Sequence, residues 1–314
     1  MSCHLHQPIP DSISQTDPLF PSSSIQLMGS TLARPGSLSK PFYSTTDMSA
    51  AVLKRLEETS WVGCPAYLLE VIFIVHAWCS GPNAGPTSRP KMIFPSAFLA
   101  KNADPLESPR ALLYHIQAFD PAAWAETMQS YVFLPDLTMR IALATIYRAA
   151  VYLYASRVLC RPRDGPMLSL ASGLGIPSDH VDVANLLIRQ ISLIPTADPH
   201  FKCLIWPTFI AGAECRDPSL RPFLMEKLSA LYYDITSINV RNAAWVLSLM
   251  WRKRDQKRVE KASRRWESSL GACSSSSSFT STPHSPHDMN DDDDDDDFDW
   301  IQELDESRVD WLFI

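Results

Sequence analysis

With 314 residues, of which 46% are hydrophobic and 20% charged, the chain has ample apolar material for one large domain or two modest ones. Its 25 prolines and 10 glycines favour helices that end at prolines over a turn-rich β fold, and seven scattered cysteines without a C-x2-C pair argue against a zinc finger, ribbon or cluster. The net charge of -7 conceals a strongly acidic tail: residues 288–314 carry 13 acidic residues and one arginine, whereas the remainder has 22 acidic and 27 basic residues, so the whole-chain charge says little about nucleic-acid binding.

Residues 1–47 are rich in Ser, Pro and Thr and show little periodicity. Such a segment cannot bury enough apolar surface to offset the entropy of ordering, so we expect it to be disordered. The N-terminus has neither a basic start nor an apolar run, and we expect no signal peptide. The most apolar windows, Tyr67–Cys79 and Ile141–Leu159, are interrupted by charged residues, which predicts buried helices and no membrane span.

The fold is expected to begin near residue 48, where MSAAVLKRLEETS has a helical pattern. Apolar residues at helical spacing predict a second helix over Pro65–Cys79. The Gly/Pro-rich stretch Gly81–Pro90 predicts a loop. Farther on, Pro121 suits the first position of a helix for which Asp120 is the N-cap.

Leu137–Cys160 is the longest helical candidate, and its apolar residues wrap much of the circumference, as in a helix central to a bundle. Residues 161–178 break this pattern. We expect the next helix to start near Asp179, with Ser178 as its cap, and to stop at Pro195.

Pro199–Cys215 is again apolar and helical, and Pro207 near its middle should kink it or split it in two. The pair Asp217-Pro218 predicts the N-cap and first position of another helix. Asn239 is the expected cap of the last helix, whose apolar stripe fades after Trp251 as charged residues take over.

Together these elements predict an all-α, multi-helix domain over residues 48–267, which follows the disordered segment 1–47. A Ser-rich linker and the acidic, aromatic tail occupy residues 268–314. No strand alternation and no internal repeat is visible in the sequence.

Four features resemble the fungal-specific transcription factor domain, the helical regulatory region of zinc binuclear cluster regulators, over roughly residues 48–255. Trp61, Gly63 and Pro65 open an apolar helix, and the long helix near 137–160 follows. The remaining features are the segment LIWPTFIAGAEC, Leu204–Cys215, and the helix around Ala244–Trp251.

The resemblance implies an all-α regulatory domain in a nuclear protein without catalytic residues, frequent homodimers, and control of metabolic, stress or secondary-metabolite genes. The six-cysteine cluster with which this family reads DNA has no counterpart here, since Cys3 has no partner at the right spacing. A missing upstream exon, a truncation or action without direct DNA contact would each explain this absence.

The acidic tail holds bulky apolar residues among its acids, the composition of acidic activation segments. Acids keep such residues solvated until they dock in an apolar groove on a coactivator. An inert solubilising tail and a last helix that packs back on the basic body are the alternatives. The candidate activation residues are Phe298, Trp300, Ile301, Leu304, Trp311, Leu312 and Phe313.

A basic stretch before the linker is a candidate nuclear localisation signal or phosphate-contacting surface. One alternative is a solvated helix end, where cations are favourable near the C-terminus of the helix. The other is pairing in cis with the acidic tail, which would mask the basic stretch and the tail and would become weaker as the salt concentration rises. The residues are Arg252, Lys253, Arg254, Lys257, Arg258, Lys261, Arg264 and Arg265.

An enzyme is disfavoured. Asp291–Asp297 invites comparison with the magnesium-binding motif of terpene synthases, but these aspartates follow a Ser-rich linker and repel one another, which favours an extended chain. Cys64, His76 and Cys79 are better explained as core residues than as metal ligands. No motif of a nucleophile elbow, phosphate loop or zinc protease occurs. The sequence therefore predicts no catalytic, cofactor-binding or metal-binding residues.

The leading hypothesis is a fungal transcriptional regulator whose helical domain dimerises, with itself or a related regulator, and whose tail contacts the transcription machinery. DNA is then contacted indirectly or through a missing zinc cluster. The alternative is a helical adaptor or inhibitor that lacks its own DNA-binding module and acts through a full-length regulator.

Overall fold

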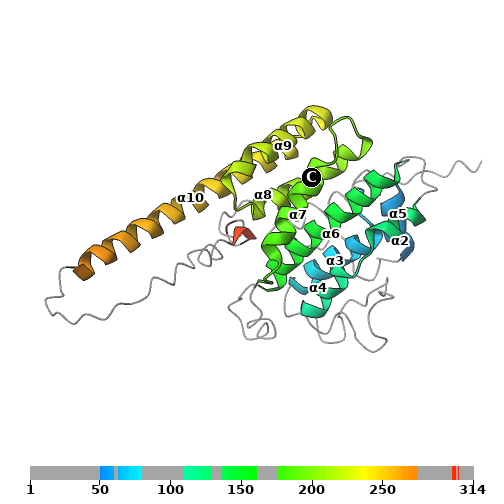
Figure 1. Ribbon diagram of the computed structural model, residues 1–314. Helices are drawn as coiled ribbons and strands as arrows, with labels where there is room; N and C mark the ends of the chain where they lie inside the picture. The colour runs from blue at the N-terminus through cyan, green and yellow to red at the C-terminus, as the bar shows by residue number, and fades with distance from the viewer. Residues whose placement is uncertain are drawn as a thin grey trace, which may run out of the picture.

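The computed structural model describes residues 50–59, 63–79, 109–128, 136–160, 176–273, 299–301 and 303, and these are helical, without a strand (Figure 1). The predicted all-α fold class is thus confirmed for the described part of the chain. The expectations of a disordered N-terminal segment and of a loop at Gly81–Pro90 fall outside it. The helices are α2 (Ala50–Thr59), α3 (Ala66–Cys79), α4 (Pro109–Gln117), α5 (Pro121–Thr127), α6 (Leu137–Leu159), α7 (His180–Ser192), η2 (Pro199–Leu204), α8 (Ile205–Glu214), η3 (Pro218–Leu220), α9 (Arg221–Ile235) and α10 (Ile238–Cys273).

Helix α6 is the centre of the bundle, as its all-round apolar sequence predicts. It packs against α3, α4, α5, α7 and α8, and nearly its whole length after Arg140 is buried. Asp136 starts the helix by accepting hydrogen bonds from the backbone amides of Thr138 and Met139. Farther along, the Tyr147 hydroxyl donates to the Cys203 carbonyl oxygen at 2.8 Å and so fixes η2 against this helix.

Two of the predicted N-caps are confirmed. The Asp120 carboxylate accepts hydrogen bonds from the amides of Ala122 and Ala123 at the start of α5, where Pro121 takes the first position. Asp217 likewise caps η3, with Pro218 in its first position. In both places the capping residue and the proline are neighbours in the sequence, so the signal is local.

The two other predicted caps are wrong by one or two residues. Ser178 is the predicted cap of α7, but Asp179 takes the position before the helix. The Asp179 carboxylate does not cap the helix either and instead accepts hydrogen bonds from Tyr152 and Gln117. At the start of α10 the hydroxyl of Ser237 accepts from the amide of Asn239, so Ser237 takes the place expected for Asn239.

Pro207 lies in the first turn of α8, because the segment splits at Leu204 between η2 and α8. The predicted split is therefore confirmed. A first-turn residue has no intrahelical acceptor for its amide, so proline costs little there.

We expect the burial of His115 on α4 to make the fold sensitive to mild acid. Its ring stacks on Tyr67 with centroids 4.6 Å apart, and neither ring nitrogen has a hydrogen-bond partner among the described residues. Burial lowers the pKa of His115 from 6.5 to about 4. As the pH falls, His115 is therefore protonated in the unfolded chain before it is protonated in the folded protein. The free energy of unfolding that depends on neutral His115 is complete above pH 6.5 and declines below it.

We expect the free energy of unfolding to fall by roughly 1–2 kcal/mol between about pH 7 and pH 5, allowing for residual solvent screening. Urea titrations at the two pH values measure it. His115→Phe keeps a ring against Tyr67 but cannot titrate, so its free energy should change less. An equal change in both proteins would show that His115 does not cause the effect.

Helices α9 and α10 pair side by side, and α10 extends well beyond the rest of the bundle (Figure 1). Its first half packs closely on α8: the Trp251 indole donates to the Gly212 carbonyl oxygen at 2.9 Å, and a Cβ on Gly212 would lie 2.5 Å from Leu247. Between Val259 and Glu267 every side chain of α10 is exposed. The predicted continuation of this helix past Trp251 is thus confirmed.

Candidate functional site

A short segment near the C-terminus lies against the helical body, shown in red beside α8 in Figure 1. The Asp299 carboxylate accepts a hydrogen bond from the Ile301 amide. The backbone carbonyl oxygen of Asp299 accepts one from the Glu303 amide, and this bond closes one helical turn. Trp300, Ile301 and Glu303 are all buried in spite of their position in the acidic tail. Residues 299–303, with residue 302 not described, are called the tail turn below.

Trp300 anchors the tail turn and is completely buried. One contact of its indole is the ring of Phe209 on α8, edge to face, with centroids 6.1 Å apart. The indole N–H donates a hydrogen bond of 2.6 Å to Oε1 of Glu214, the last residue of α8. The aromatic edge and the carboxylate thus fix both the position and the orientation of this ring.

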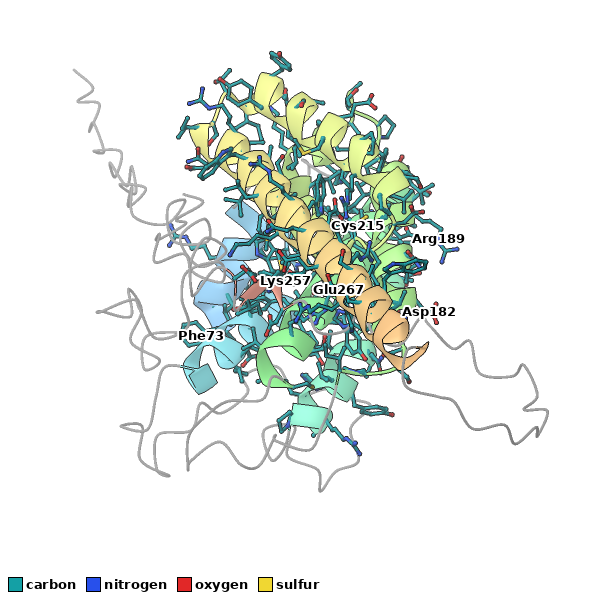
Figure 2. The ribbon with its side chains drawn as sticks, turned by 90° about the vertical axis from the view of Figure 1, so that its left-hand side faces the viewer. Phe73, Asp182, Arg189, Cys215, Lys257 and Glu267 are labelled. Carbon is teal, nitrogen blue, oxygen red and sulfur yellow. The ribbon has the colours of Figure 1, made fainter. Side chains whose placement is uncertain are left out.

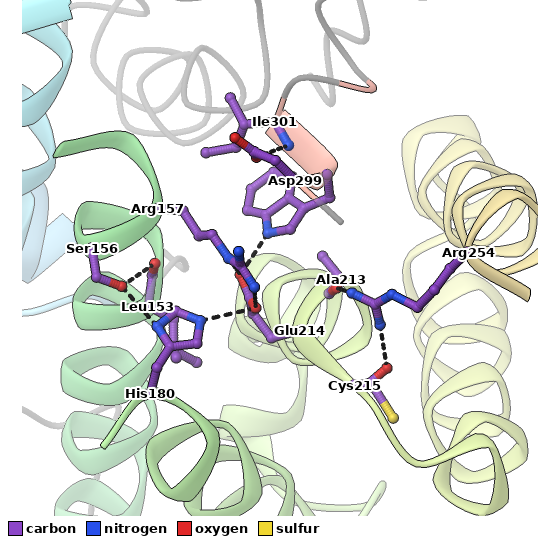
Figure 3. Close-up of polar contacts among 11 residues, drawn as sticks. Leu153, Ser156, Arg157, His180, Ala213, Glu214, Cys215, Arg254, Asp299 and Ile301 are labelled. Atoms are coloured by element: carbon purple, nitrogen blue, oxygen red, sulfur yellow. Dashed lines mark hydrogen bonds and ion pairs between the residues drawn. The ribbon is translucent and has the colours of Figure 1, made fainter. Parts of the chain in front are cut away.

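Glu214 is the centre of a buried charge cluster assembled from three helices and the tail turn (Figure 3). From α6, Arg157 donates from Nε to Oε1 and from Nη2 to Oε2, both at 2.8 Å. From α7, His180 Nε2 lies 2.9 Å from Oε2. With the indole of Trp300, each carboxylate oxygen accepts two hydrogen bonds, which is the full capacity of the group.

These partners keep Glu214 ionised although it is buried. Burial alone would raise its pKa, but Arg157 and His180 outweigh this effect, and the pKa lies well below the ordinary range. The position is otherwise unfavourable for an anion, because Glu214 ends α8, where the helix dipole is negative.

His180 lies between Ser156 and Glu214 in this cluster. Its Nδ1 is 2.9 Å from the Ser156 hydroxyl oxygen, and that hydroxyl also contacts the Leu153 carbonyl oxygen. On the other side of the ring, Nε2 is 2.9 Å from Oε2 of Glu214. These two contacts fix the orientation of the imidazole within the cluster.

A second contact fastens the tail turn to α10. The Glu303 carboxylate forms ion pairs with Lys253 and with Lys257, at 2.6 Å for the latter, and these two lysines lie one helical turn apart. Burial raises the pKa of Glu303, but the two lysines more than offset it and hold the pKa below its usual value. The lysine side chains are more than half exposed (Figure 2 marks Lys257 on α10), so solvent and salt reach this contact.

Within the basic stretch, Arg254 is set apart by its burial. Its guanidinium donates to the carbonyl oxygens of Cys215 at 2.7 Å and Ala213 at 3.2 Å (Figure 3). A cation at this end of α8 both satisfies carbonyls that lack intrahelical partners and opposes the helix dipole. The guanidinium of Arg254 is thus engaged in contacts within the fold.

The other predicted basic residues are distributed along α10 from Arg252 to Arg265. Lys253 and Lys257 contact Glu303, and Arg258 is half-buried. The exposed remainder comprises Arg252, Lys261, Arg264 and Arg265.

Of the candidate activation residues, the structure describes Trp300 and Ile301, both buried against the body. Phe298, Leu304, Trp311, Leu312 and Phe313 lie outside the described residues, as do the aspartates 291–297. Sequence reasoning missed the Glu214 cluster. A charged residue at the end of the apolar segment Leu204–Cys215, and Arg157 within an apolar helix, are the signals that point to it.

The four cysteines whose side chains the structure describes lie in the core. Cys64, Cys160, Cys203 and Cys215 are buried free thiols, and burial raises the pKa of Cys203 to about 12. Across the described ranges, no three His, Cys, Asp or Glu side chains are placed to hold a metal ion. The side chains of His76 and Cys79 are not described. None of the described helices is both long and apolar enough to cross a membrane.

Comparison with known proteins gives two matches. The sequence profile of the fungal specific transcription factor domain matches residues 99–313, a range that includes α4 to α10 and the tail turn. The acriflavine sensitivity control protein acr-2 of Neurospora crassa is 26% identical over 209 residues, which make up 65% of this chain and 32% of that protein. The chain thus spans about a third of the length of this relative. No solved structure matches this chain.

Proposed function

Because this chain belongs to the fungal specific transcription factor domain family, we propose that it is the regulatory part of a fungal transcriptional regulator that works in the nucleus. The observation that carries the proposal is the family match, which includes most of the helical body and the tail turn. We extend the proposal to the control of metabolic, stress or secondary-metabolite genes, the target classes that the family resemblance implies. The name of the Neurospora relative refers to acriflavine sensitivity, which favours stress genes among these classes.

The tail is proposed to contact the transcription machinery through a coactivator. The composition of the tail supports this proposal, because bulky apolar residues lie among thirteen acidic residues. Trp300 and Ile301 belong to this set and are buried against the body. A coactivator groove therefore competes with the body for these two residues, and they act after the tail turn has left its place.

The exposed cations of α10 are proposed to serve nuclear import or electrostatic contact with phosphates. Arg252, Lys261, Arg264 and Arg265 are exposed on a helix that extends beyond the bundle. A receptor or a phosphate backbone can reach such a helix, whereas the buried Arg254 contributes nothing to it.

A reporter assay tests the activation proposal. Residues 288–314 joined to a heterologous DNA-binding domain should activate a reporter gene, and Trp300→Ala with Trp311→Ala should abolish the signal because docking depends on the large apolar side chains. Gln302→Ala is the matched control and should leave it unchanged. A tail that gives no signal, or a signal that survives loss of both tryptophans, refutes the proposal.

A second candidate function is that of an adaptor or inhibitor that pairs with a related full-length regulator. The absence of any C-x2-C pair from this sequence favours it, since the chain then reaches DNA only through a partner or through a cluster outside this sequence. Co-precipitation with promoter DNA distinguishes the two. An adaptor loses its promoter signal when the partner regulator is deleted, whereas a regulator with its own cluster keeps it.

A further inference from the structure

We infer that the surface formed by Phe209 and Glu214 of α8 and by Lys253 and Lys257 of α10 is a peptide-binding site. Its ligand is a single helical turn with Trp, an aliphatic residue and Glu at positions i, i+1 and i+3. In this protein the chain's own tail turn occupies the site, through Trp300, Ile301 and Glu303. We call it the turn-binding site.

The contacts define what the site selects. Glu214 offers one buried acceptor position on Oε1, which an indole N–H fills and a phenyl ring cannot. The Phe209 ring packs against the indole, and the two lysines require an anion three residues later. Of the nine tryptophans in the chain, Trp300 alone has an aliphatic residue at the next position and Glu at the third. The match between occupant and site is therefore specific on three counts.

The site is complete without its occupant, which makes the contact exchangeable. Arg157 and His180 still provide three hydrogen bonds to Glu214 when Trp300 leaves, so no buried charge loses its compensation. Lys253 and Lys257 are more than half exposed and regain water. The occupant, in contrast, is one turn, too short to be stable as an isolated helix, and depends on the site for its conformation.

A labelled peptide of residues 296–307 tests the inference by fluorescence polarisation with the full chain. The wild-type chain should bind it weakly, because its own tail turn fills the site. Two full chains with a vacated site, Trp300→Ala and Glu303→Lys, should bind it at least about 10-fold more tightly, since internal competition is removed. Circular dichroism shows whether each chain keeps its helices.

Substitutions on both partners then locate the binding surface. Adding Lys253→Glu and Lys257→Glu to the Trp300→Ala chain should weaken peptide binding about 10-fold or more, whereas Arg252→Glu with Arg264→Glu, equal in charge and on the same helix, should change it about twofold at most. A peptide with W300F should bind about 10-fold to 100-fold more weakly, because it lacks the donor for Glu214.

Three results would overturn the inference. In the first, the peptide binds the wild-type chain as tightly as both vacated chains. In the second, neither vacated chain binds the peptide although both keep their helices. In the third, both vacated chains lose the helical signal. The last result would make the tail turn an inseparable part of the core.

Discussion

Replacement of Glu214 by alanine is expected to lower the free energy of unfolding by about 3–5 kcal/mol, the usual loss when a buried ion pair loses one partner. The variant removes the carboxylate that pairs with the buried guanidinium of Arg157 and that contacts Nε2 of His180. The indole N–H of Trp300 loses its acceptor as well. No water replaces these contacts at low cost, because Glu214 is only 3% exposed.

Urea denaturation followed by circular dichroism near pH 7 measures this loss. The pKa of Glu214 is lowered in the folded state, so its contribution is complete above the ordinary carboxyl pKa of 4.5 and declines as the pH falls below it. Asp255→Ala is the matched control: Asp255 also binds an arginine, Arg221, through two hydrogen bonds, but its side chain is 48% exposed. We expect it to cost about 1 kcal/mol or less. Equal losses in the two variants would contradict the structural role of the cluster.

Arg254→Ala is expected to cost about 1.5–3 kcal/mol of unfolding free energy, the range for hydrogen bonds that involve a charged group. The substitution leaves the carbonyl oxygens of Ala213 and Cys215 without this donor at the buried end of α8. It also removes the cation that opposes the helix dipole there. The loss should appear as a lower urea midpoint at an unchanged slope.

Arg252→Ala and Arg264→Ala are the controls for this prediction, since both side chains are exposed on the same helix. Each should change the free energy of unfolding by about 0.5 kcal/mol or less. If Arg254→Ala is as mild as the controls and instead impairs nuclear import or phosphate binding, its assignment as a structural residue is wrong. The expected pattern would divide the basic stretch into one buried structural residue and an exposed functional set.

Local signals in the sequence were sufficient to predict most of the helices. The apolar residues of Leu137–Cys160 wrap much of the helix circumference, and this predicts its central place in the bundle. Asp120 and Pro121 are adjacent and specify the start of α5 by themselves. The predicted cap of α7, Ser178, was wrong: Asp179 takes the position before the helix, and its carboxylate is engaged by Tyr152 and Gln117, 27 and 62 residues away in sequence.

The Glu214 cluster was beyond such reasoning because its members are distant in sequence. Glu214 binds Arg157 and His180, 57 and 34 residues before it, and Trp300, 86 residues after it. Nothing in the periodicity of one helix states which charged residue of another will face it. Docking of the tail on the basic body was one of the alternatives that the tail composition left open. In the structure, Trp300 and Ile301 are buried against the body. Activation by the tail stays a prediction.

Amide hydrogen exchange of residues 299–303 in the full chain tests most directly whether the tail turn is bound to the body. The amides of Ile301 and Glu303 are hydrogen-bonded within a turn that depends on the body for its conformation. They should therefore exchange at least about 10-fold more slowly than in an unstructured peptide, and Lys253→Glu with Lys257→Glu should accelerate their exchange. Exchange of the wild-type segment at the rate of an unstructured peptide would contradict the account.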